Sequence, residues 1–144
     1  PSAGHVLAFG DGKVFAWGQN SHGQLGLGPR CADEPHFTMP TSIPTLCNSF
    51  RTFVQVACAA DHTLFLDVKN EVMACGSNSH GQLGFLKPKH PELGGPDATG
   101  APVTRSPQDG LTYVDTPTTV LALKVFSVKH IATSHHHTIV LTGM

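Results

Sequence analysis

Charged residues and strong helix formers are scarce in this sequence of 144 residues. Only 13% of the residues are Asp, Glu, Lys or Arg, about half the share of a typical soluble domain. Glutamate, which surface helices use heavily, occurs only as Glu34, Glu71 and Glu92. Turn-forming residues are plentiful instead, with 15 glycines and 11 prolines. These numbers argue against long helices and favour short strands joined by many turns.

A surplus of cationic side chains is also missing, because 9 Lys and Arg face 10 Asp and Glu. Tight nonspecific binding to nucleic acid needs such a surplus, so we expect none by this segment. No run approaches the roughly 18 apolar residues of a membrane span, and neither a polybasic stretch nor a secretory leader is visible. We therefore expect no membrane contact and an intracellular location, cytoplasmic or nuclear.

The four cysteines, Cys31, Cys47, Cys58 and Cys75, form no C-x-x-C pair, which argues against a zinc ribbon. Cys58 and Cys75 lie in apolar, strand-like runs, where a free thiol packs as a small hydrophobic group. We expect free thiols in a reducing compartment, and the even count leaves a disulfide framework as the alternative.

The sequence does contain an internal repeat. Residues 13–28 read KVFAWGQNSHGQLGLG and residues 71–85 read EVMACGSNSHGQLGF. A second element recurs as VACAADHTLFL over residues 56–66 and IATSHHHTIVL over residues 131–141, and a truncated copy begins at His5. A weaker echo pairs PTSI at residues 40–43 with PTTV at residues 117–120. Such strings do not recur by chance from composition.

Along one unit the pieces run P-T-x-[IV], [VF]-x-V-A, H-T-[LI], V-[FM]-A-x-G and N-S-H-G-Q-L-G. Four short strands in about 50–60 residues are typical of a propeller blade. We predict an all-β fold, a partial β-propeller of about two four-stranded antiparallel blades. The expected parts are a partial blade (1–28), a full repeat (29–85), a long insertion (86–112) and a partial repeat (113–144).

The expected insertion is rich in proline and glycine, so we predict a long surface loop without a helix or a central strand. Its basic residues could contact a partner, because loops on a rigid scaffold often carry function. A solvated, functionless insertion is the alternative. The candidate partner-binding residues are Lys87, Lys89, His90 and Arg105.

The number of repeats is too small for a closed propeller, which has roughly 4–8 blades. Each blade can bury its apolar faces only against its neighbours. We therefore expect a segment of a larger ring, whose remaining blades come from the same parent chain or from other chains.

The run VFAWGQNSHGQLGLG at residues 14–28, with DHTL at 61–64 and HHHTI at 135–139, resembles the repeat of the Regulator of Chromosome Condensation family. The resemblance implies a seven-bladed β-propeller of four-stranded blades. For the founding member it implies nucleotide exchange on the small GTPase Ran and docking on chromatin. Other carriers of the repeat use the disc as an interaction surface, in ubiquitin ligases, ciliary proteins, kinases and light sensors.

Some positions depart from the family pattern. Cys75 stands where the first repeat has Trp17, and the glycine that usually opens the G-x-x-H-T motif is Ala59 in one copy and Thr133 or Ser134 in the other. These changes weaken the expectation of a strict exchange factor. A light sensor of this family would need clustered tryptophans, and the single tryptophan excludes that activity for this segment.

We interpret the recurring residues as structural, because a ligand site need not be copied into every unit. The glycines could otherwise cradle a phosphate, but no G-x-x-x-x-G-K-[ST] motif occurs. His62 and His137 could otherwise act as general bases, and we expect instead buried imidazoles that bond a backbone carbonyl. The residues given this structural role are Trp17, Gly18, Gly23, Gly26, His62, Gly76, Gly81, Gly84 and His137.

Two further interpretations concern aromatic and metal-binding side chains. Phe15 and Trp17 lie two apart on a strand, so we expect both to pack in the core rather than stack on a base. His135 and His137 would share a strand face and are weak metal candidates, but no third ligand follows at a set spacing, so we predict no metal.

No catalytic triad, paired carboxylates or metal motif gives grounds for bond chemistry, and no cofactor is implied. We expect a non-enzymatic protein-interaction module with a protein partner. One alternative is a guanine nucleotide exchange factor for a Ran-like small GTPase with chromatin association. A second is a structural component of a larger assembly.

Overall fold

The computed structural model describes residues 4–29, 34–47, 50–85, 95–96, 102–105 and 112–143. Short strands dominate, as the composition predicts. They are β1 (His5–Gly10), β2 (Lys13–Gln19), β3 (His36–Ser42), β4 (Phe53–Cys58), β5 (His62–Asp67), β6 (Val72–Ser77), β7 (Gly95–Pro96), β8 (Pro102–Arg105), β9 (Thr112–Thr119), β10 (Ser127–Thr133) and β11 (Thr138–Gly143). The two helical turns described are α1 (Pro44–Cys47) and the 3-10 helix η2 (Leu121–Leu123).

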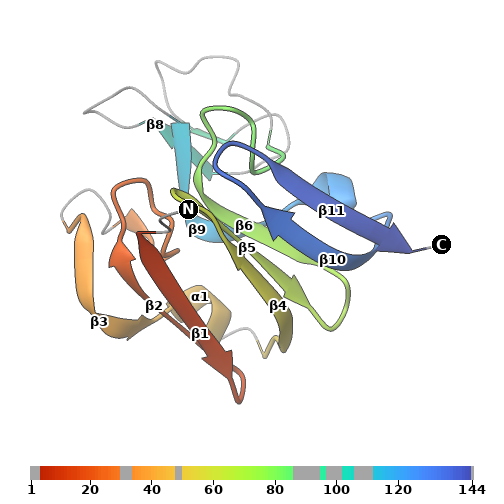
Figure 1. Ribbon diagram of the computed structural model, residues 1–144, viewed down its shortest axis with the longest axis horizontal. Coiled ribbons are helices and arrows are strands. Elements are labelled where there is room, and N and C mark those ends of the chain that lie inside the picture. Colours follow the sequence, from red (N-terminus) through yellow and green to blue (C-terminus); the bar gives the residue numbers. More distant parts are fainter. Residues whose placement is uncertain are drawn as a thin grey trace.

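Three antiparallel sheets follow one another along the chain and stand side by side (Figure 1). Blade 1 has the strand order β1-β2-β3, blade 2 the order β4-β5-β6-β9 with β8 and β7 added beyond β9, and blade 3 consists of β10 and β11. The prediction of an all-β, partial propeller is confirmed. One blade has the complete set of four strands, and its two neighbours have three and two described strands. We call the contact of blades 1 and 2 the first junction and that of blades 2 and 3 the second junction.

Each repeat of the sequence is offset by one strand from the blade that it builds. The P-T-x-[IV] segments lie in or after β3 and β9, and these strands pair with β2 and β6 of the preceding blade. Met73 faces Thr119, for example, on the outer side of blade 2. The chain therefore crosses a junction within every repeat, which ties neighbouring blades together covalently.

The stretch over residues 86–112 differs from the expected loop where the structure describes it. β8 pairs with β9 through Thr104 and Tyr113, and β7 pairs with the other edge of β8. The prediction of no central strand here is therefore wrong, because β8 lies between two strands. Pro102 stands at the start of β8, a position where the missing N–H of proline costs least.

The two faces of each blade pack against different neighbours because side chains alternate along a strand. In β5, Phe65 belongs to the apolar cluster of the first junction, whereas Leu64 and Leu66 belong to that of the second. All three are at most 1% exposed. Burying a side chain of this size contributes roughly 1.5–3 kcal/mol, so blade 2 gains stability from both neighbours.

The aromatic pair of β2 does not lie in the core as expected. Val14 and Ala16 are fully buried in the first junction, and Phe15 and Trp17 on the opposite face of β2 are only half-buried. The strand has the predicted alternation, but its larger side chains point away from blade 2. No described strand packs there to cover them fully.

Gly18 and Gly76 occupy equivalent places in β2 and β6, each with φ of 103°. A β-carbon on Gly76 would lie 2.4 Å from the carbonyl oxygen of Asp61, and one on Gly18 would lie 2.5 Å from that of Gly4. Only glycine allows this close approach of two backbones. The approach brings the strand beside the residues that begin the polar network described next.

Candidate functional site

A buried chain of three polar groups crosses the first junction. The Nε2 atom of His5 in blade 1 lies 2.7 Å from the Thr63 hydroxyl of blade 2. That hydroxyl donates a hydrogen bond of 2.8 Å back to the main-chain carbonyl of Gln24 in blade 1. We call this chain of histidine, threonine and glutamine carbonyl the relay.

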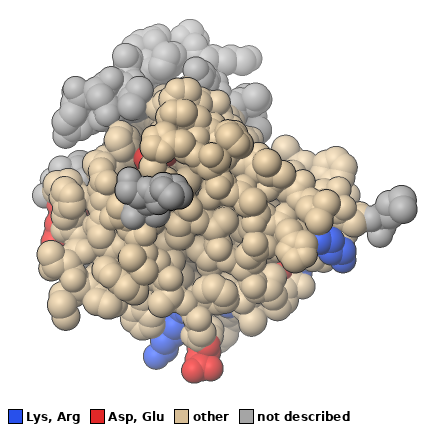
Figure 2. All heavy atoms as spheres, in the orientation of Figure 1, with Lys and Arg blue, Asp and Glu red and all other residues tan. Residues whose placement is uncertain are grey.

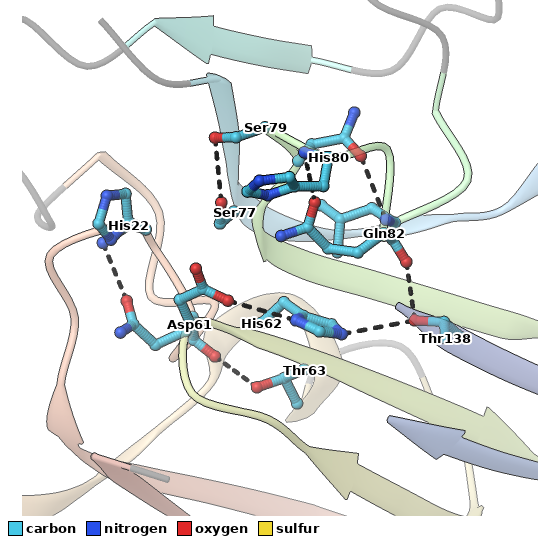
Figure 3. A network of polar contacts seen from close by, with 12 residues as sticks. His22, Asp61, His62, Thr63, Ser77, Ser79, His80, Gln82 and Thr138 are labelled. Carbon is cyan, nitrogen blue, oxygen red and sulfur yellow. Dashed lines mark hydrogen bonds and ion pairs between the residues drawn. The ribbon is translucent and has the colours of Figure 1, made fainter. Parts of the chain in front are cut away.

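The second junction repeats the relay with equivalent residues (Figure 3). His62 Nε2 lies 3.4 Å from the Thr138 hydroxyl, which donates to the Gln82 carbonyl at 2.7 Å. His62 is fully buried. Its ring contacts the Thr138 hydroxyl of the next blade and not the expected backbone carbonyl. Sequence reasoning missed this partner, although the recurring H-T and G-Q pairs carried the signal.

The relay fixes the tautomer of His5. The Thr63 hydroxyl has one proton and gives it to Gln24, so it must accept a proton from His5 Nε2. His5 Nδ1 is then a buried acceptor without a hydrogen-bond partner among the described residues. Burial, together with the neighbouring His62, lowers the pKa of His5 from 6.5 to about 4. The ring is therefore neutral at pH 7.

The histidine of the second junction has a carboxylate that His5 lacks. Asp61 Oδ1 lies 3.4 Å from His62 Nδ1, whereas Gly4 occupies the equivalent position in blade 1. Burial raises the pKa of the Asp61 carboxyl, but the hydrogen bond and charge of His62, with His22 and His135 adding, bring it below its ordinary value. Both ring nitrogens of His62 thus face acceptors, and only one of His5 does.

The two N-S-H-G-Q-L-G loops have the same internal hydrogen bonds. The amide oxygens of Asn20 and Asn78 each accept from the backbone N–H five residues later at 3.1 Å. Gln24 and Gln82 each accept from the N–H two residues earlier at 2.9 Å. The glycines expected to be structural all have φ between 69° and 103°: Gly18, Gly23, Gly26, Gly76, Gly81 and Gly84. In each loop these contacts hold the glutamine carbonyl that the relay uses.

Two more polar links involve blade 2, one across the second junction and one within the blade. The side chain of Gln55 in β4 donates to the Ile131 carbonyl at 2.8 Å and accepts from the Ile131 N–H at 3.0 Å, so it pairs with β10 like a strand. At the other end of blade 2, Arg51 lies 2.7 Å from both Asp67 and Glu71. The Arg51 guanidinium lowers the pKa of the Glu71 carboxyl. Neither link was expected from the sequence.

The histidines near the third blade lie in a loop and not on a strand. His135, His136 and His137 precede β11 and are exposed, and the His136 ring stacks 4.3 Å from that of His80. Within the described ranges, no group of three or more His, Cys, Asp or Glu could hold a metal ion. His135 and His137 therefore lack the shared strand face on which their metal candidacy rested, and the expectation of a buried imidazole at His137 is wrong.

Most candidate partner-binding residues fall outside the described residues, namely Lys87, Lys89 and His90. The backbone of Arg105 ends β8 and faces Thr112. The surface in Figure 2 is mostly uncharged, with Lys and Arg only at its lower and right margins. In the part of the chain that the structure covers, no helix is long and apolar enough to cross a membrane.

Cysteines are free wherever the structure describes them: Cys47, Cys58 and Cys75. Cys31 lies outside the described residues. Burial raises the pKa of the Cys58 thiol to about 11 and holds that of Cys75 well above its ordinary value, so both thiols stay protonated at pH 7.

Comparison with known proteins identifies the repeat. Two family models of the Regulator of chromosome condensation (RCC1) repeat match, one over residues 11–66 and one over residues 53–82. Together they span half of the chain. The chain belongs to the RCC1 repeat family. The matched part contains Gln24 and Thr63 of the relay, whereas His5 lies before it.

The curated relatives are much longer proteins. The human "Probable E3 ubiquitin-protein ligase HERC6" is 47% identical over 76 residues, which are 53% of this chain and 7% of that protein. The human "Probable E3 ubiquitin-protein ligase HERC3" is 40% identical over 89 residues, which are 61% of this chain and 8% of that protein. The chain thus spans less than a tenth of the length of these relatives.

Solved structures show the same fold. Yeast RCC1 (Prp20), crystallised with Kap60, matches with a TM-score of 0.72 at 24% identity, over 96% of this chain and 28% of that chain. Human WBSCR16 matches with a TM-score of 0.67 at 24% identity, over 97% of this chain and 29% of that chain. This chain therefore has the fold of successive blades of an RCC1-type propeller.

Proposed function

We propose that this chain is a segment of an RCC1-type propeller that acts as a non-enzymatic protein-interaction module. The observation that carries the proposal is the outer face of blade 3. Ile139 and Leu141 are 62% and 57% exposed there, whereas the equivalent Leu64 and Leu66 of blade 2 are each 1% exposed under blade 3. A further blade, from the same parent chain or another chain, would cover this face as blade 3 covers blade 2.

The junctions support an interaction role because they make the loops rigid. Each relay and each N-S-H-G-Q-L-G loop is held by buried or partly buried hydrogen bonds, so the chain that leaves them starts from a fixed position (Figure 3). Binding through preorganised loops costs less conformational entropy than binding through a flexible segment. Lys87, Lys89, His90 and Arg105 remain the proposed partner contacts, and the partner is a protein.

The solution mass of the chain tests the proposal. Because two large apolar side chains are exposed on one sheet face, we expect concentration-dependent association in sedimentation experiments. Replacing both Ile139 and Leu141 by Asp should abolish the association, and circular dichroism checks that this variant still folds. A chain that stays a monomer at every concentration contradicts the proposal.

Guanine nucleotide exchange on a Ran-like small GTPase is a second candidate function. Its support is the fold shared with Prp20p from Saccharomyces cerevisiae, whose crystal structure was described together with its binding properties to Gsp1p and histones. A nucleotide-release assay with the full-length protein separates the two candidates. Acceleration for a Ran-like GTPase would favour exchange, and no acceleration for any of them would remove it.

A structural role in a larger assembly is the remaining alternative, and the apolar outer face is compatible with it as well. Ligase chemistry is not assigned to this chain, although ligases are among its relatives, because the matched part is 7% of HERC6. An assembly role predicts that the chain copurifies in fixed proportion with its neighbours. If the chain is an interaction module, we expect the bound partner to dissociate and to exchange with free partner in solution.

A further inference from the structure

One phenylalanine combines full exposure with a strained backbone. Phe50 lies shortly before β4, its side chain is 103% exposed, and its φ is 49°. Only two other described residues besides glycine have a positive φ, namely Asp11 and Asn70. Asp and Asn tolerate this left-handed conformation, whereas a bulky side chain is strained in it. Phe50 therefore holds backbone strain and gains nothing from burial within this chain, a combination that points to a binding residue.

The exposure of Phe50 does not depend on a further blade. Phe50 lies in the connection from blade 1 to blade 2, and both of these blades are present. Val125 occupies the equivalent place before β10 in the next connection, and it is 84% exposed. An apolar side chain thus lies in water at the same place in two successive connections.

The two connections flank the turn between β5 and β6, because β4 pairs with β5 and β9 pairs with β6 (Figure 1). On one side, the Val68 N–H of this turn donates to the Thr52 carbonyl at 2.9 Å. On the other side, Lys124 Nζ lies 3.8 Å from Glu71 Oε1. Apolar and basic side chains therefore follow one another across this end of blade 2. We call them the end strip, and its members are Phe50, Val68, Lys69, Lys124 and Val125.

The end strip has positive charge that its own surroundings do not neutralise. Lys69 is exposed and has no ion-pair partner among the described residues. Lys124 is 49% exposed, and the carboxylate that it faces, Glu71, lies closer to Arg51, at 2.7 Å. A partner with complementary charge must therefore bring carboxylates together with apolar side chains.

We propose that the end strip binds an acidic amphipathic helix of a partner protein. The apolar face of the helix would cover Phe50, Val68 and Val125. Glutamates along its margins would pair with Lys69 and Lys124. The strip is built from three separate turns and connections and offers no free strand edge, so its shape suits a helix with anchors three and four residues apart. The inference rests on the proposed interaction role and names the kind of partner.

A synthetic peptide of about 18 residues is the probe, with leucines three and four positions apart and glutamates between them. The labelled peptide is titrated with the full chain and followed by fluorescence anisotropy at low salt. The matched control peptide has the same leucines and a lysine in place of each glutamate. We expect it to bind at least about tenfold more weakly, and we expect added salt to weaken binding of the glutamate peptide.

Phe50→Gly separates binding from stability. Glycine adopts a positive φ without strain, so this variant should unfold at no lower a temperature than the natural chain. Its affinity for the glutamate peptide should fall by about tenfold, because the aromatic anchor is lost. Asp11→Gly is the matched control, since Asp11 has the same φ of 49° in the turn between β1 and β2. It should leave the affinity unchanged.

Lys69→Glu tests the charge, because it should weaken binding of the glutamate peptide and strengthen binding of the lysine peptide. Circular dichroism checks that each variant folds. No binding of the glutamate peptide, equal binding of both peptides, or an unchanged affinity in Phe50→Gly overturns the inference. Anionic phospholipid vesicles are the last probe. If they bind the chain through Phe50 while the peptide does not bind, the strip contacts a membrane surface and the inference is wrong.

Failure of the end strip is distinguishable from failure of the proposed function. The sedimentation experiment reads the outer face of blade 3, through Ile139 and Leu141, and does not involve the strip. A chain that associates through that face but ignores the glutamate peptide would keep the propeller proposal and remove the helix site. A chain that stays a monomer and binds the peptide through Phe50 would do the reverse.

Discussion

The first and second junctions share one polar frame and differ in their apolar filling. In both, a histidine contacts a threonine hydroxyl, which donates to a glutamine carbonyl at 2.8 Å and 2.7 Å. Phe65, Met73 and Cys75 fill the first junction, whereas Val140 leaves a hollow of about 310 Å³ in the second. The bond from threonine to glutamine is kept when the filling changes, whereas the distance from histidine to threonine lengthens from 2.7 Å to 3.4 Å. The filling then decides how stable each junction is.

The largest effect is expected from Phe65→Ala. Phe65 is fully buried and its ring lies 5.8 Å from that of Phe53. Its loss should lower the free energy of unfolding by about 4 kcal/mol, through lost burial and a new cavity. Val140→Ala, beside an existing hollow, should cost about 1 kcal/mol. Urea unfolding at one protein concentration, followed by the fluorescence of Trp17, measures both. Equal losses would mean that the two junctions are equally packed.

The next effect is a loss of stability in acid that comes from the first junction. The pKa of His5 is about 4 in the folded chain and 6.5 for an ordinary histidine. Between these values the unfolded chain binds the proton more readily, so the free energy of unfolding falls as the pH falls from 6.5 to 4. One such group accounts for about 3 kcal/mol.

Unfolding measured across that pH range checks the effect with two variants. His5→Gln keeps a donor near Thr63 but cannot titrate, so it should flatten the pH dependence. His136→Gln, at an exposed position, should leave the dependence unchanged. Asp61 has a lowered pKa, and its protonation removes stability at more acid pH in either variant. A His5→Gln chain with an unaltered slope would assign the acid sensitivity to other groups.

A smaller difference should separate the two threonines. Thr63→Val leaves His5 Nε2 unpaired, and the Gln24 carbonyl with only the Cys75 thiol, in a fully buried place, at a cost of about 2 kcal/mol. Thr138→Val should cost about 1 kcal/mol, because His62 keeps Asp61 and the site is only partly buried. Thermal unfolding of the two variants side by side gives the ranking. A reversed order would show that the carboxylate does not compensate.

The smallest effect is expected outside the relays, at Arg51. Its side chain is 26% exposed, and the guanidinium lies 2.7 Å from both Asp67 and Glu71. Arg51→Met keeps the aliphatic stem and should lower the free energy of unfolding by about 1 kcal/mol at low salt, and by less in high salt. Unfolding curves at two ionic strengths measure this. A loss independent of salt would point to packing rather than charge.

The sequence predicted the positions of the strands and loops well, but it predicted poorly which strands pair with one another. The repeat located β2, β5, β6 and both glycine loops, because a loop such as Asn20 to Leu25 is closed by bonds within five residues. It did not reveal that the P-T-x-[IV] segments belong to the preceding blade, nor that β8 becomes an inner strand. Strand pairing across insertions is set by contacts far apart in the chain, which no local pattern encodes.

The candidate site divides in the same way. His62 and the glycines were singled out by recurrence, whereas Gln55, Val140 and the glutamine carbonyls were not. Gln55 and Ile131 are 76 residues apart, and β10 has no copy of Gln55 to signal its role. The prediction that Phe15 and Trp17 are buried was wrong. The alternation of side chains along β2 shows which residues share a face of the strand, but it does not show which face a neighbouring blade covers.

The sequence by itself determined that this chain forms short strands with recurring loops, because turn chemistry, positive φ at glycine and alternating side chains act within a few residues. Only the tertiary structure decided which hydroxyl each histidine contacts and which aromatic residues are buried. These depend on how neighbouring blades pack, and His5 meets Thr63 across 58 residues of chain only once both blades have formed.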